Sequence, residues 1–391
     1  MAEACTHTSL LEKTAAVLFY VSFGVWLTYL FFAAGTFYGV YFTSDMRLAI
    51  RVFCGLLLLA GELLEHKWTW RTLGALAITG ILAYCCTRAN LVNAFDAIVI
   101  IFFGRNRDFK IAARIALCCF VFGLVVTILS AKLGIIENHI TESATRTRDY
   151  LGFRYPLRPQ MYLFIVTCLI IYLAQEKFNL VLAGLLIVAN VLMFSFTGSR
   201  LSCSFAVMVV IAGFIFRKRQ NAAPISVSLV LASSFFVAAL IGFTTALLYD
   251  PGVAWMVDLN TFFGERLRLA HDGIQDFGIS LFGQRVNMVG GGLDVYGNPK
   301  QGTYNYVDCV YIQLAILLGV VYLACYLAAM SVTTYRAFRK GDVLLGIIFV
   351  AFAFHGIIDN ATMYLHYNVF LLACAPLLSE YQYEKALKLD G

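Results

Sequence analysis

Residues 111–133, IAARIALCCFVFGLVVTILSAKL, carry the pattern that decides the fold, a long apolar run with charged residues only near its two ends. A helix needs about 20 apolar residues to cross the roughly 30 Å hydrocarbon core of a bilayer. Runs of this kind, separated by short polar clusters, recur along the whole chain. The pattern predicts an all-α polytopic membrane protein.

The composition excludes an ordinary soluble domain. Of the 391 residues, 61% are hydrophobic and 13% are charged, whereas about a quarter of the residues in soluble domains are charged. The net charge of +6 would suggest nucleic acid binding in a soluble protein, but we expect no nucleic-acid partner here. Most of the 11 cysteines lie inside apolar runs without metal-type spacing, so we interpret them as core residues.

The apolar runs predict about 12 transmembrane helices in a single integral membrane domain, residues 1–391, without an internal repeat. The N-terminus lacks a basic region and a cleavage site, so we expect the first run to be a retained span. The predicted spans are 14–35, 48–64, 72–87, 91–104, 111–133, 160–175, 178–197, 200–216, 223–247, 307–330, 343–358 and 367–379.

Basic residues in short loops predict the orientation. GRNRDFK (104–110), FRKRQ (216–220) and TYRAFRK (334–340) would be cytoplasmic, which places both termini in the cytoplasm. The two long loops, 134–159 and 248–306, would then be extracytoplasmic. Both contain arginines against the usual bias, and an anionic ligand would explain them; these are Arg146, Arg148, Arg154, Arg158, Arg266, Arg268 and Arg285.

TGSR, residues 197–200, falls between two predicted spans at their outward ends. Gly198 can end the first helix and Ser199 can cap the second, so a tight helix hairpin with a snorkelling arginine is one interpretation. The other places Arg200 near the top of the bundle, facing an anionic group. We favour the second because charged residues at such depths are usually functional.

TRTRDYLGFRYPLRP, residues 145–159, forms the outward loop after the fifth span. Its arginines could hold phosphate through bidentate contacts. Some of them could instead meet lipid headgroups. We select Arg148 first and Arg146 next as substrate-binding candidates.

The loop 248–306, between spans 9 and 10, is predicted to hold short interfacial helices, because NTFFGERLRLAHDGIQDFG (260–278) has apolar residues at roughly helical spacing. We expect Gly283 to stop this element. Arg266 and Arg268 are two residues apart and cannot share a helix face, so one would enter a site and the other would be solvated or paired. GGGLDVYGNPKQG (290–302) is interpreted as plain loop, because no strand and helix flank it as in a phosphate-binding loop.

NYVDCVYIQLAILLG (305–319) places Asp308 at the start of the tenth span, with Tyr306 and Tyr311 nearby. A carboxylate there can serve only as a helix cap. Alternatively, Asp308 acts as a general base toward a sugar hydroxyl, which requires burial to raise its pKa.

FHGIIDNATMYLHYN (354–368) joins the last two spans on the same outward face. Each of its polar residues alone is more readily structural than catalytic. Together they could line a sugar subsite, and the candidates are His355, Asp359, Tyr364, His366 and Asn368.

These motifs together resemble the Wzy-type oligosaccharide repeat-unit polymerases of the O-antigen ligase/polymerase superfamily. The matching features lie in the family's order over residues of about 145 to 372. They are LGFRYP (151–156), TGSR (197–200), GERLRLAHDGIQDFGISLFGQ (264–284), YVDCVYIQLAILLG (306–319) and HYNVFLL (366–372).

The resemblance implies a metal-independent membrane glycosyltransferase, without a cofactor, on the outer face of the bacterial cytoplasmic membrane. It would move a growing glycan from an undecaprenyl-diphosphate carrier to a lipid-linked repeat unit, with membrane lipids, a chain-length regulator and a flippase as partners. Arg148, Arg200 and Arg266 occupy the positions expected to bind the diphosphate. Asp308 lies where the related ligases have a histidine.

The arginines of the predicted outward loops fit the chemistry of such a transfer. A lipid diphosphate is a good leaving group, so arginines can stabilise its charge without a metal, and no D-x-D cluster lies on an outward loop. Two alternatives stay open. One is a ligase that transfers finished glycan to another acceptor, and the other is a secondary transporter or flippase of lipid-linked sugars, which predicts repeat symmetry and broken helices near the midplane.

Overall fold

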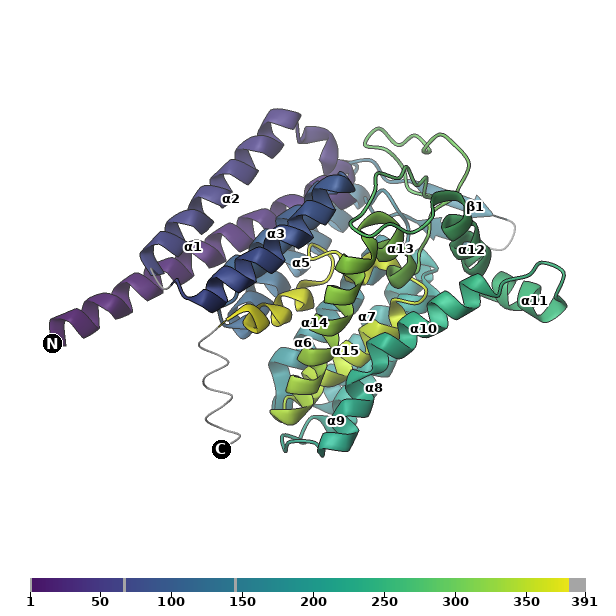
Figure 1. Ribbon diagram of the computed structural model, residues 1–391. Helices are drawn as coiled ribbons and strands as arrows, with labels where there is room; N and C mark the ends of the chain where they lie inside the picture. Colours follow the sequence, from purple (N-terminus) through teal and green to yellow (C-terminus); the bar gives the residue numbers. More distant parts are fainter. Residues whose placement is uncertain (1, 66–67, 144–145, 380–391) are drawn as a thin grey trace.

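The computed structural model describes residues 2–65, 68–143 and 146–379 (Figure 1). Most of these residues are helical, and helices occupy the predicted apolar ranges, as expected. The described α-helices are α1 (Ala2–Gly35), α2 (Ser44–Glu65), α3 (Trp70–Arg88), α4 (Val92–Phe103), α5 (Phe109–Lys132), α6 (Arg158–Ala174), α7 (Leu180–Thr197), α8 (Arg200–Phe216), α9 (Ile225–Ala232), α10 (Ser234–Leu247), α11 (Ala254–Phe262), α12 (Arg266–Phe277), α13 (Val310–Leu317), α14 (Gly319–Arg339) and α15 (Val343–His355).

Within the described residues, five helical segments are long and apolar enough to cross a membrane. Only 22% of the most apolar part of α7 is buried within the protein, although its mean hydropathy is 2.3, so most of this apolar surface faces outward. Such a surface is suited to lipid rather than water. The structure is therefore that of a helical membrane protein. The five segments are Leu10–Gly35, Phe109–Lys132, Arg158–Lys177, Leu180–Thr197 and Ile225–Leu247.

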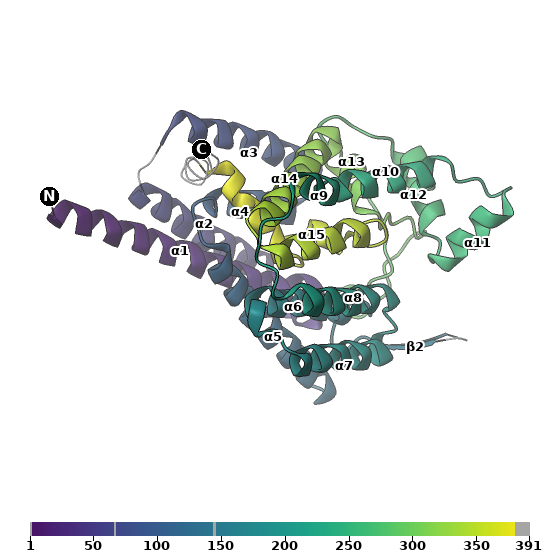
Figure 2. The ribbon, with the colours of Figure 1, turned by 90° about the horizontal axis from the view of Figure 1, so that it is seen from below.

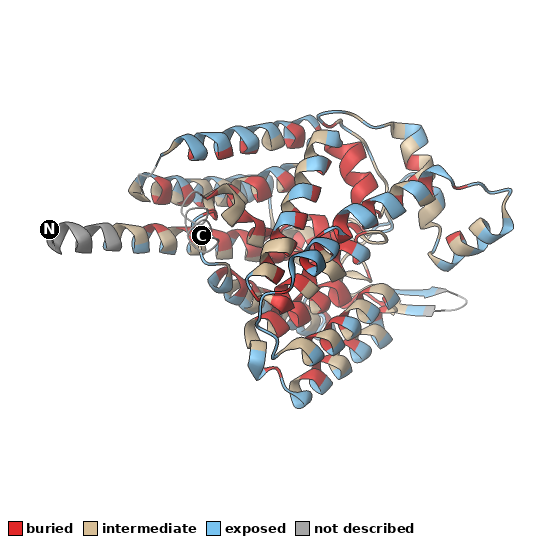
Figure 3. Cartoon of the chain, turned by 60° about the horizontal axis from the view of Figure 1, so that its bottom comes forward, coloured by how far each residue is buried: buried red, intermediate tan, exposed pale blue. Residues whose placement is uncertain are grey.

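The core is centred on α6, α13 and α15. In α6, 67% of the most apolar window is buried, and every residue of α13 is buried. Figure 2 shows α6 between α5, α7 and α8, and α6 packs against all three. Figure 3 shows that buried residues gather on these inner helices, whereas α2 and α3 have many exposed ones. A buried amide pair joins α6 to α7, since the Gln160 Nε2 atom donates to Asn190 Oδ1 over 2.9 Å.

Two predicted spans are each broken into two helices. The span 223–247 is divided into α9 and α10 at Ser233, and the span 307–330 begins later, at Val310, and is divided into α13 and α14. Gly319 has φ of +89°, and a Cβ there would lie 2.5 Å from the backbone of both Leu281 and Gly283. Only glycine fits this approach, so the loop before α13 packs directly against the break.

Two further predictions about helix ends and spans need correction. The helix α12 ends at Phe277 with Gly278 as its cap (φ +65°), so Gly283 does not stop it; Gly283 instead packs against the carbonyl oxygens of Leu317 and Cys85. The last span, predicted as 367–379, is the 3₁₀ helix η4 (Val369–Leu378), which contains Pro376. Other 3₁₀ helices are η1 (Phe37–Tyr41), η2 (Gln175–Lys177) and η3 (Asn360–Met363).

The loop after α5 also departs from an all-α expectation, since it forms an antiparallel hairpin of β1 (Ile140–Ser143) and β2 (Arg146–Asp149). Asp149 ends the hairpin by accepting a 2.6 Å hydrogen bond from Lys132 Nζ and another from Leu151 N. These contacts tie the hairpin to the end of α5. The Leu151–Gly152 turn that follows, with φ of +53° and +82°, directs the chain toward α6.

Candidate functional site

An ion pair joins the start of α12 to the segment just before α13. The Nε atom of Arg266 lies 3.3 Å from Oδ2 of Asp308, with 24% and 14% of the two side chains exposed. The guanidinium is held in place because Nε donates to Ile358 O (2.7 Å) and Nη1 donates to Phe263 O (2.9 Å). Asp308 therefore faces an arginine whose position is set by two backbone carbonyls.

The local backbone explains why α12 begins at Arg266. Gly264 and Glu265 both have φ near +65°, which turns the chain sharply. Buried Asn260 then caps the helix by accepting from Arg268 N (3.0 Å), and it donates to Glu265 Oε2 (2.8 Å). This turn directs the Arg266 side chain toward Asp308, just before α13, and toward Ile358, after α15.

The carboxyl group of Asp308 has a pKa well above the ordinary value for aspartate. Burial raises its pKa from the ordinary 3.8 to about 7, while Arg266 opposes that increase, Asp359 adds to it and Arg158 opposes it. Asp308 does not cap α13, because Cys309 occupies that position. A carboxyl group poised near neutral pH can accept and release a proton, which suits a general base.

A cavity of about 110 Å³ lies beside Asp308. Its wall comes from three segments that are distant in sequence, 155–161, 290–308 and 359–361, so only the tertiary fold forms it. The residues on its wall are Tyr155, Leu157, Arg158, Met161, Gly290, Gly291, Gly292, Lys300, Tyr304, Tyr306, Asp308, Asp359, Asn360 and Ala361.

Arg158, the first residue of α6, supplies positive charge to this wall. Its guanidinium lies 4.0 Å from the centre of the Tyr367 ring and 5.9 Å from that of Tyr155. It forms no ion pair with any carboxylate in the described residues. The N-terminal end of a helix adds partial positive charge. Arg158 is therefore free to bind an anion.

The loop before α6 positions these groups. Arg154 donates through Nη2 to Ala33 O (3.1 Å) and Ala34 O (2.5 Å) at the end of α1, which anchors the loop. Tyr155 follows directly and lines the cavity. Arg154 thus has a structural contact, whereas the neighbouring Arg158 supplies charge to the cavity.

Hydrogen bonds hold the opposite wall. Asn360 donates to the hydroxyl oxygen of Tyr306 (2.6 Å) and to Oε1 of buried Gln313 (2.7 Å). Asp359 accepts from Ala361 N (2.8 Å). Gly290 completes this wall, since a Cβ there would lie 3.2 Å from the Tyr306 ring. The polar wall can therefore orient a hydroxyl-rich ligand with little rearrangement.

Four of the predicted residues meet at this site, namely Asp308, Arg266, Tyr306 and Asp359. Arg148 and Arg200, which were predicted from the 145–159 and TGSR motifs, do not line the cavity. Arg200 is exposed at the start of α8, and Arg148 lies against the preceding turn, where a Cβ on Gly198 would be 3.6 Å from its Nε atom. The side chain of Arg146 lies outside the described residues.

Arg268 is the member of its pair that points away. It forms ion pairs with Glu265 (3.1 Å) and Asp272 (3.0 Å), and 45% of its side chain is exposed. Arg266 and Arg268 therefore have different partners, and only Arg266 contacts Asp308.

The remaining predicted candidates have structural contacts inside the core. Tyr311 donates to Ala353 O (2.7 Å), and His355 stacks on Phe164 with ring centres 5.2 Å apart. Asn368 accepts from Phe370 N and donates to Thr362 O. None of these three candidates lines the cavity.

Several cavity residues were not selected from the sequence. Arg158 was noted only as one of seven outward arginines, although an arginine directly before a proline at a helix start was a usable signal. The glycines 290–292 were interpreted as plain loop, yet all three line the cavity. Tyr155, Lys300 and Asn360 carried no sequence pattern that distinguishes them.

In the described residues, no three His, Cys, Asp or Glu side chains come together as a metal site would require. Comparisons with protein-family models, with curated proteins and with solved structures found no match to this chain. The resemblance to Wzy-type polymerases therefore stays a prediction, and the geometry of the site supports the proposal that follows.

Proposed function

We propose that this protein is a membrane glycosyltransferase that polymerises undecaprenyl-diphosphate-linked oligosaccharide repeat units. In this proposal the chain crosses the bacterial cytoplasmic membrane about twelve times, with both termini in the cytoplasm. The Asp308 cavity then lies at the outer face. The observation that carries the proposal is that Asp308, with a pKa of about 7, contacts Arg266 beside a cavity to which Arg158 contributes an unpaired positive charge.

The proposed reaction is a displacement at the anomeric carbon of the donor glycan. A hydroxyl oxygen of the acceptor sugar forms the new glycosidic bond, while the bond between the anomeric carbon and the diphosphate oxygen breaks. The Asp308 carboxylate takes the hydroxyl proton. Undecaprenyl diphosphate leaves with the bonding electrons, and Arg158 and Arg266 stabilise its negative charge.

The other predicted arginines have a separate place in this proposal. Arg148 lies against Gly198, two residues before Arg200, so these two side chains belong to one corner of the protein. We propose that they bind diphosphate or lipid headgroups as the carrier approaches. Their removal should affect the capture of donor more than the chemical step.

In this proposal the cavity enlarges during the reaction. Its volume of about 110 Å³ is below the roughly 300 to 1,000 Å³ of pockets that hold drug-sized ligands. Two sugars and a diphosphate need more room. Between α12 and α13 the chain has no helix over residues 278–309, and it includes the glycines of the cavity wall. Displacement of this loop would admit substrates, as lids do in other enzymes.

The test is polymerisation of purified lipid-linked repeat units, scored by glycan length. Asp308→Asn keeps the shape of the side chain and removes the base, so the rate should fall about 10²- to 10⁴-fold. Arg268→Gln, on the exposed face of α12, which also carries Arg266, is the control and should retain activity. A ladder of products indicates a polymerase, whereas a single transfer indicates the ligase alternative.

Two results would overturn the proposal. One is an unchanged rate and chain length in folded Asp308→Asn protein. The other is uptake of lipid-linked sugar by proteoliposomes without any glycan elongation, which would favour the transporter alternative.

A further inference from the structure

A second, larger cavity lies at the opposite end of two helices that border the Asp308 cavity. α6 runs from Arg158 at the first cavity to the turn at Gln175, and α15 runs from Val343 toward Asp359. The 17 residues of α6 span about 25 Å at 1.5 Å per residue. The volume of the second cavity is about 410 Å³. The two cavities are therefore separate sites.

Positive charge dominates this second cavity. Its wall has five basic side chains and one carboxylate; they are Lys110, Arg217, Arg219, Arg336, Lys340 and Asp342. Burial raises the pKa of Asp342, while Lys110 opposes that increase. The single carboxylate is therefore less readily ionised than an exposed one, which leaves the excess of positive charge largely uncompensated.

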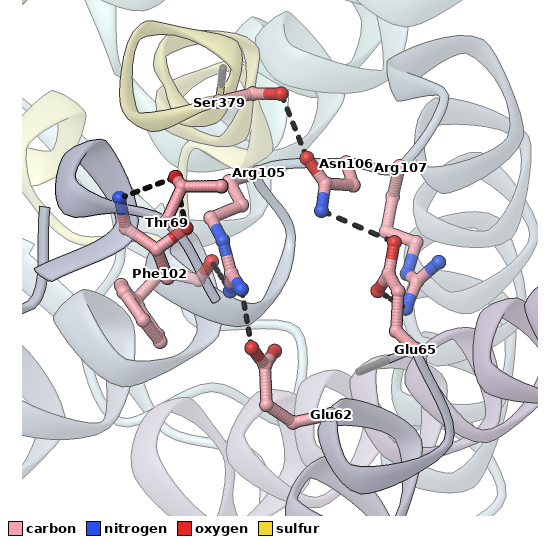
Figure 4. A network of polar contacts seen from close by, with 9 residues as sticks. Glu62, Glu65, Thr69, Phe102, Arg105, Asn106, Arg107 and Ser379 are labelled. Atoms are coloured by element: carbon pink, nitrogen blue, oxygen red, sulfur yellow. Dashed lines mark hydrogen bonds and ion pairs between the residues drawn. The ribbon is translucent and has the colours of Figure 1, made fainter. Parts of the chain in front are cut away.

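The basic residues come from all three short loops that carry basic clusters, but the loops differ in how their charge is neutralised. In the loop before α5, Arg105 pairs with Glu62 and Arg107 pairs with Glu65 (2.8 Å), while Asn106 also donates to Glu65 (Figure 4). These arginines are used to hold α2 against the loop.

The other two loops contribute three arginines to the cavity wall. Arg217, Arg219 and Arg336 form no ion pair with a carboxylate in the part of the chain that the structure describes. Arg217 donates to the carbonyl of Phe214 in its own helix. Three unpaired guanidinium groups around one cavity favour binding of an anion.

The fold brings these two loops together through close backbone contacts. Gly341 has φ of +76°, and a Cβ there would overlap the carbonyl oxygen of Gln220. Ala223 N donates to Phe338 O (3.0 Å), and Arg339 donates to Ala223 O (2.9 Å). The turn between α14 and α15 is therefore built to lie against the loop between α8 and α9.

The rest of the cavity wall combines the uncharged polar residues Gln175, Gln220 and Thr333 with apolar side chains. Leu344 and Leu345 of α15 and Pro376 and Leu377 of η4 contribute to it. A soluble phosphate would gain nothing from such a surface, whereas the glycerol and upper acyl region of a lipid would. Basic pockets between membrane helices bind anionic headgroups in this way.

We propose that this cavity binds one anionic phospholipid, with its phosphate against Arg217, Arg219 and Arg336 and its apolar part against α15 and η4. The site is distinct from the Asp308 cavity and does not depend on the glycan chemistry proposed there. Its occupant would pack between α8, α14, α15 and η4 and hold their ends together.

The test is lipid retention by the full-length protein, measured by native mass spectrometry and by titration with phosphatidylglycerol. Each basic side chain near an anionic headgroup contributes about a fivefold factor in affinity. The double variant Arg219→Gln with Arg336→Gln should therefore bind phosphatidylglycerol about 25-fold more weakly. Retention of phosphatidylcholine, which has no net charge, should stay unchanged.

Two control variants separate this site from general effects. Lys218→Gln removes one charge from the same loop, but Lys218 does not line the cavity, so affinity should stay near that of the wild type. Arg219→Lys with Arg336→Lys keeps both charges and should retain most of the binding.

Three outcomes would overturn the proposal. They are equal binding by the double glutamine variant and by Lys218→Gln, equal loss of phosphatidylcholine and phosphatidylglycerol, and displacement of bound lipid by inorganic phosphate. The last result would assign the cavity to a soluble phosphate instead of a lipid.

Discussion

Replacing Arg266 by glutamine should move the pH dependence of the proposed transfer reaction to higher pH. The Nε atom of Arg266 lies 3.3 Å from the Asp308 carboxylate, and Arg266 is the main factor that lowers the pKa of Asp308 against the effect of burial. Activity requires the ionised carboxylate, so it is lost as the pH falls through the pKa. Without the guanidinium, burial acts almost unopposed, and the pKa rises further.

The magnitude follows from the contact. An adjacent arginine lowers the pKa of a carboxyl group by about 1 to 3 pH units, so its loss should raise the pKa of Asp308 from about 7 to about 8–10. At pH 7 the wild-type carboxyl is about half ionised, whereas the variant would be ionised to about one tenth at most. The rate at pH 7 should fall at least about fivefold for this reason alone, and it should recover in alkaline buffer.

The assay is polymerisation of lipid-linked repeat units across the pH range, at saturating donor so that weaker binding is separated from the chemical step. Arg266→Lys keeps a positive charge and should keep the midpoint close to that of the wild type. Infrared difference spectroscopy of the carboxyl group gives the same midpoint without requiring activity. An unmoved midpoint in Arg266→Gln, or a wild-type profile retained by Asp308→Asn, would refute the reasoning.

Three other predictions test the site and the fold. Arg158→Gln should raise KM for the lipid-linked donor more than about tenfold, because a hydrogen bond to a charged group contributes about 1.5 to 3 kcal/mol. The effect on kcat, measured in the same assay, should be smaller. Tyr311→Phe, which loses the buried hydrogen bond to Ala353 O, should leave KM unchanged and lower the stability in thermal unfolding by about 1 kcal/mol. Gly319→Ala should lower the unfolding midpoint strongly, because its φ is +89° and a Cβ would lie 2.5 Å from Leu281 O; a midpoint equal to that of the wild type would contradict the described packing.

The hydrophobic pattern was sufficient to predict most helices. Apolar runs such as 111–133 must satisfy their backbone groups internally when they lie in lipid, and a helix does this with contacts between near neighbours in sequence. The turn at Gly198 was also predictable, because glycine readily adopts the left-handed conformation found there, with φ of +65°. The sequence did not indicate the break at Gly319, since it depends on a contact with Leu281 and Gly283.

The candidate site, like the fold, was predictable from the sequence only in part. The motifs identified Asp308 and Arg266 as functional candidates. They could not show that the two side chains form an ion pair, because 42 positions separate them in the sequence. They also favoured Arg148 and Arg200 over Arg158. All three were predicted to lie on outward loops, and sequence spacing carries no information on which one faces a cavity.

The sequence by itself determined a helical membrane protein and the segments in which its charged residues lie, because hydrophobicity and helix formation depend on local composition. Only the tertiary structure decided that Arg158 and Asp308 share one cavity, that Arg268 is paired with Glu265 and Asp272, and that His355 is buried against Phe164. These outcomes depend on contacts between distant segments, where packing and burial determine which side chains meet and how readily they ionise.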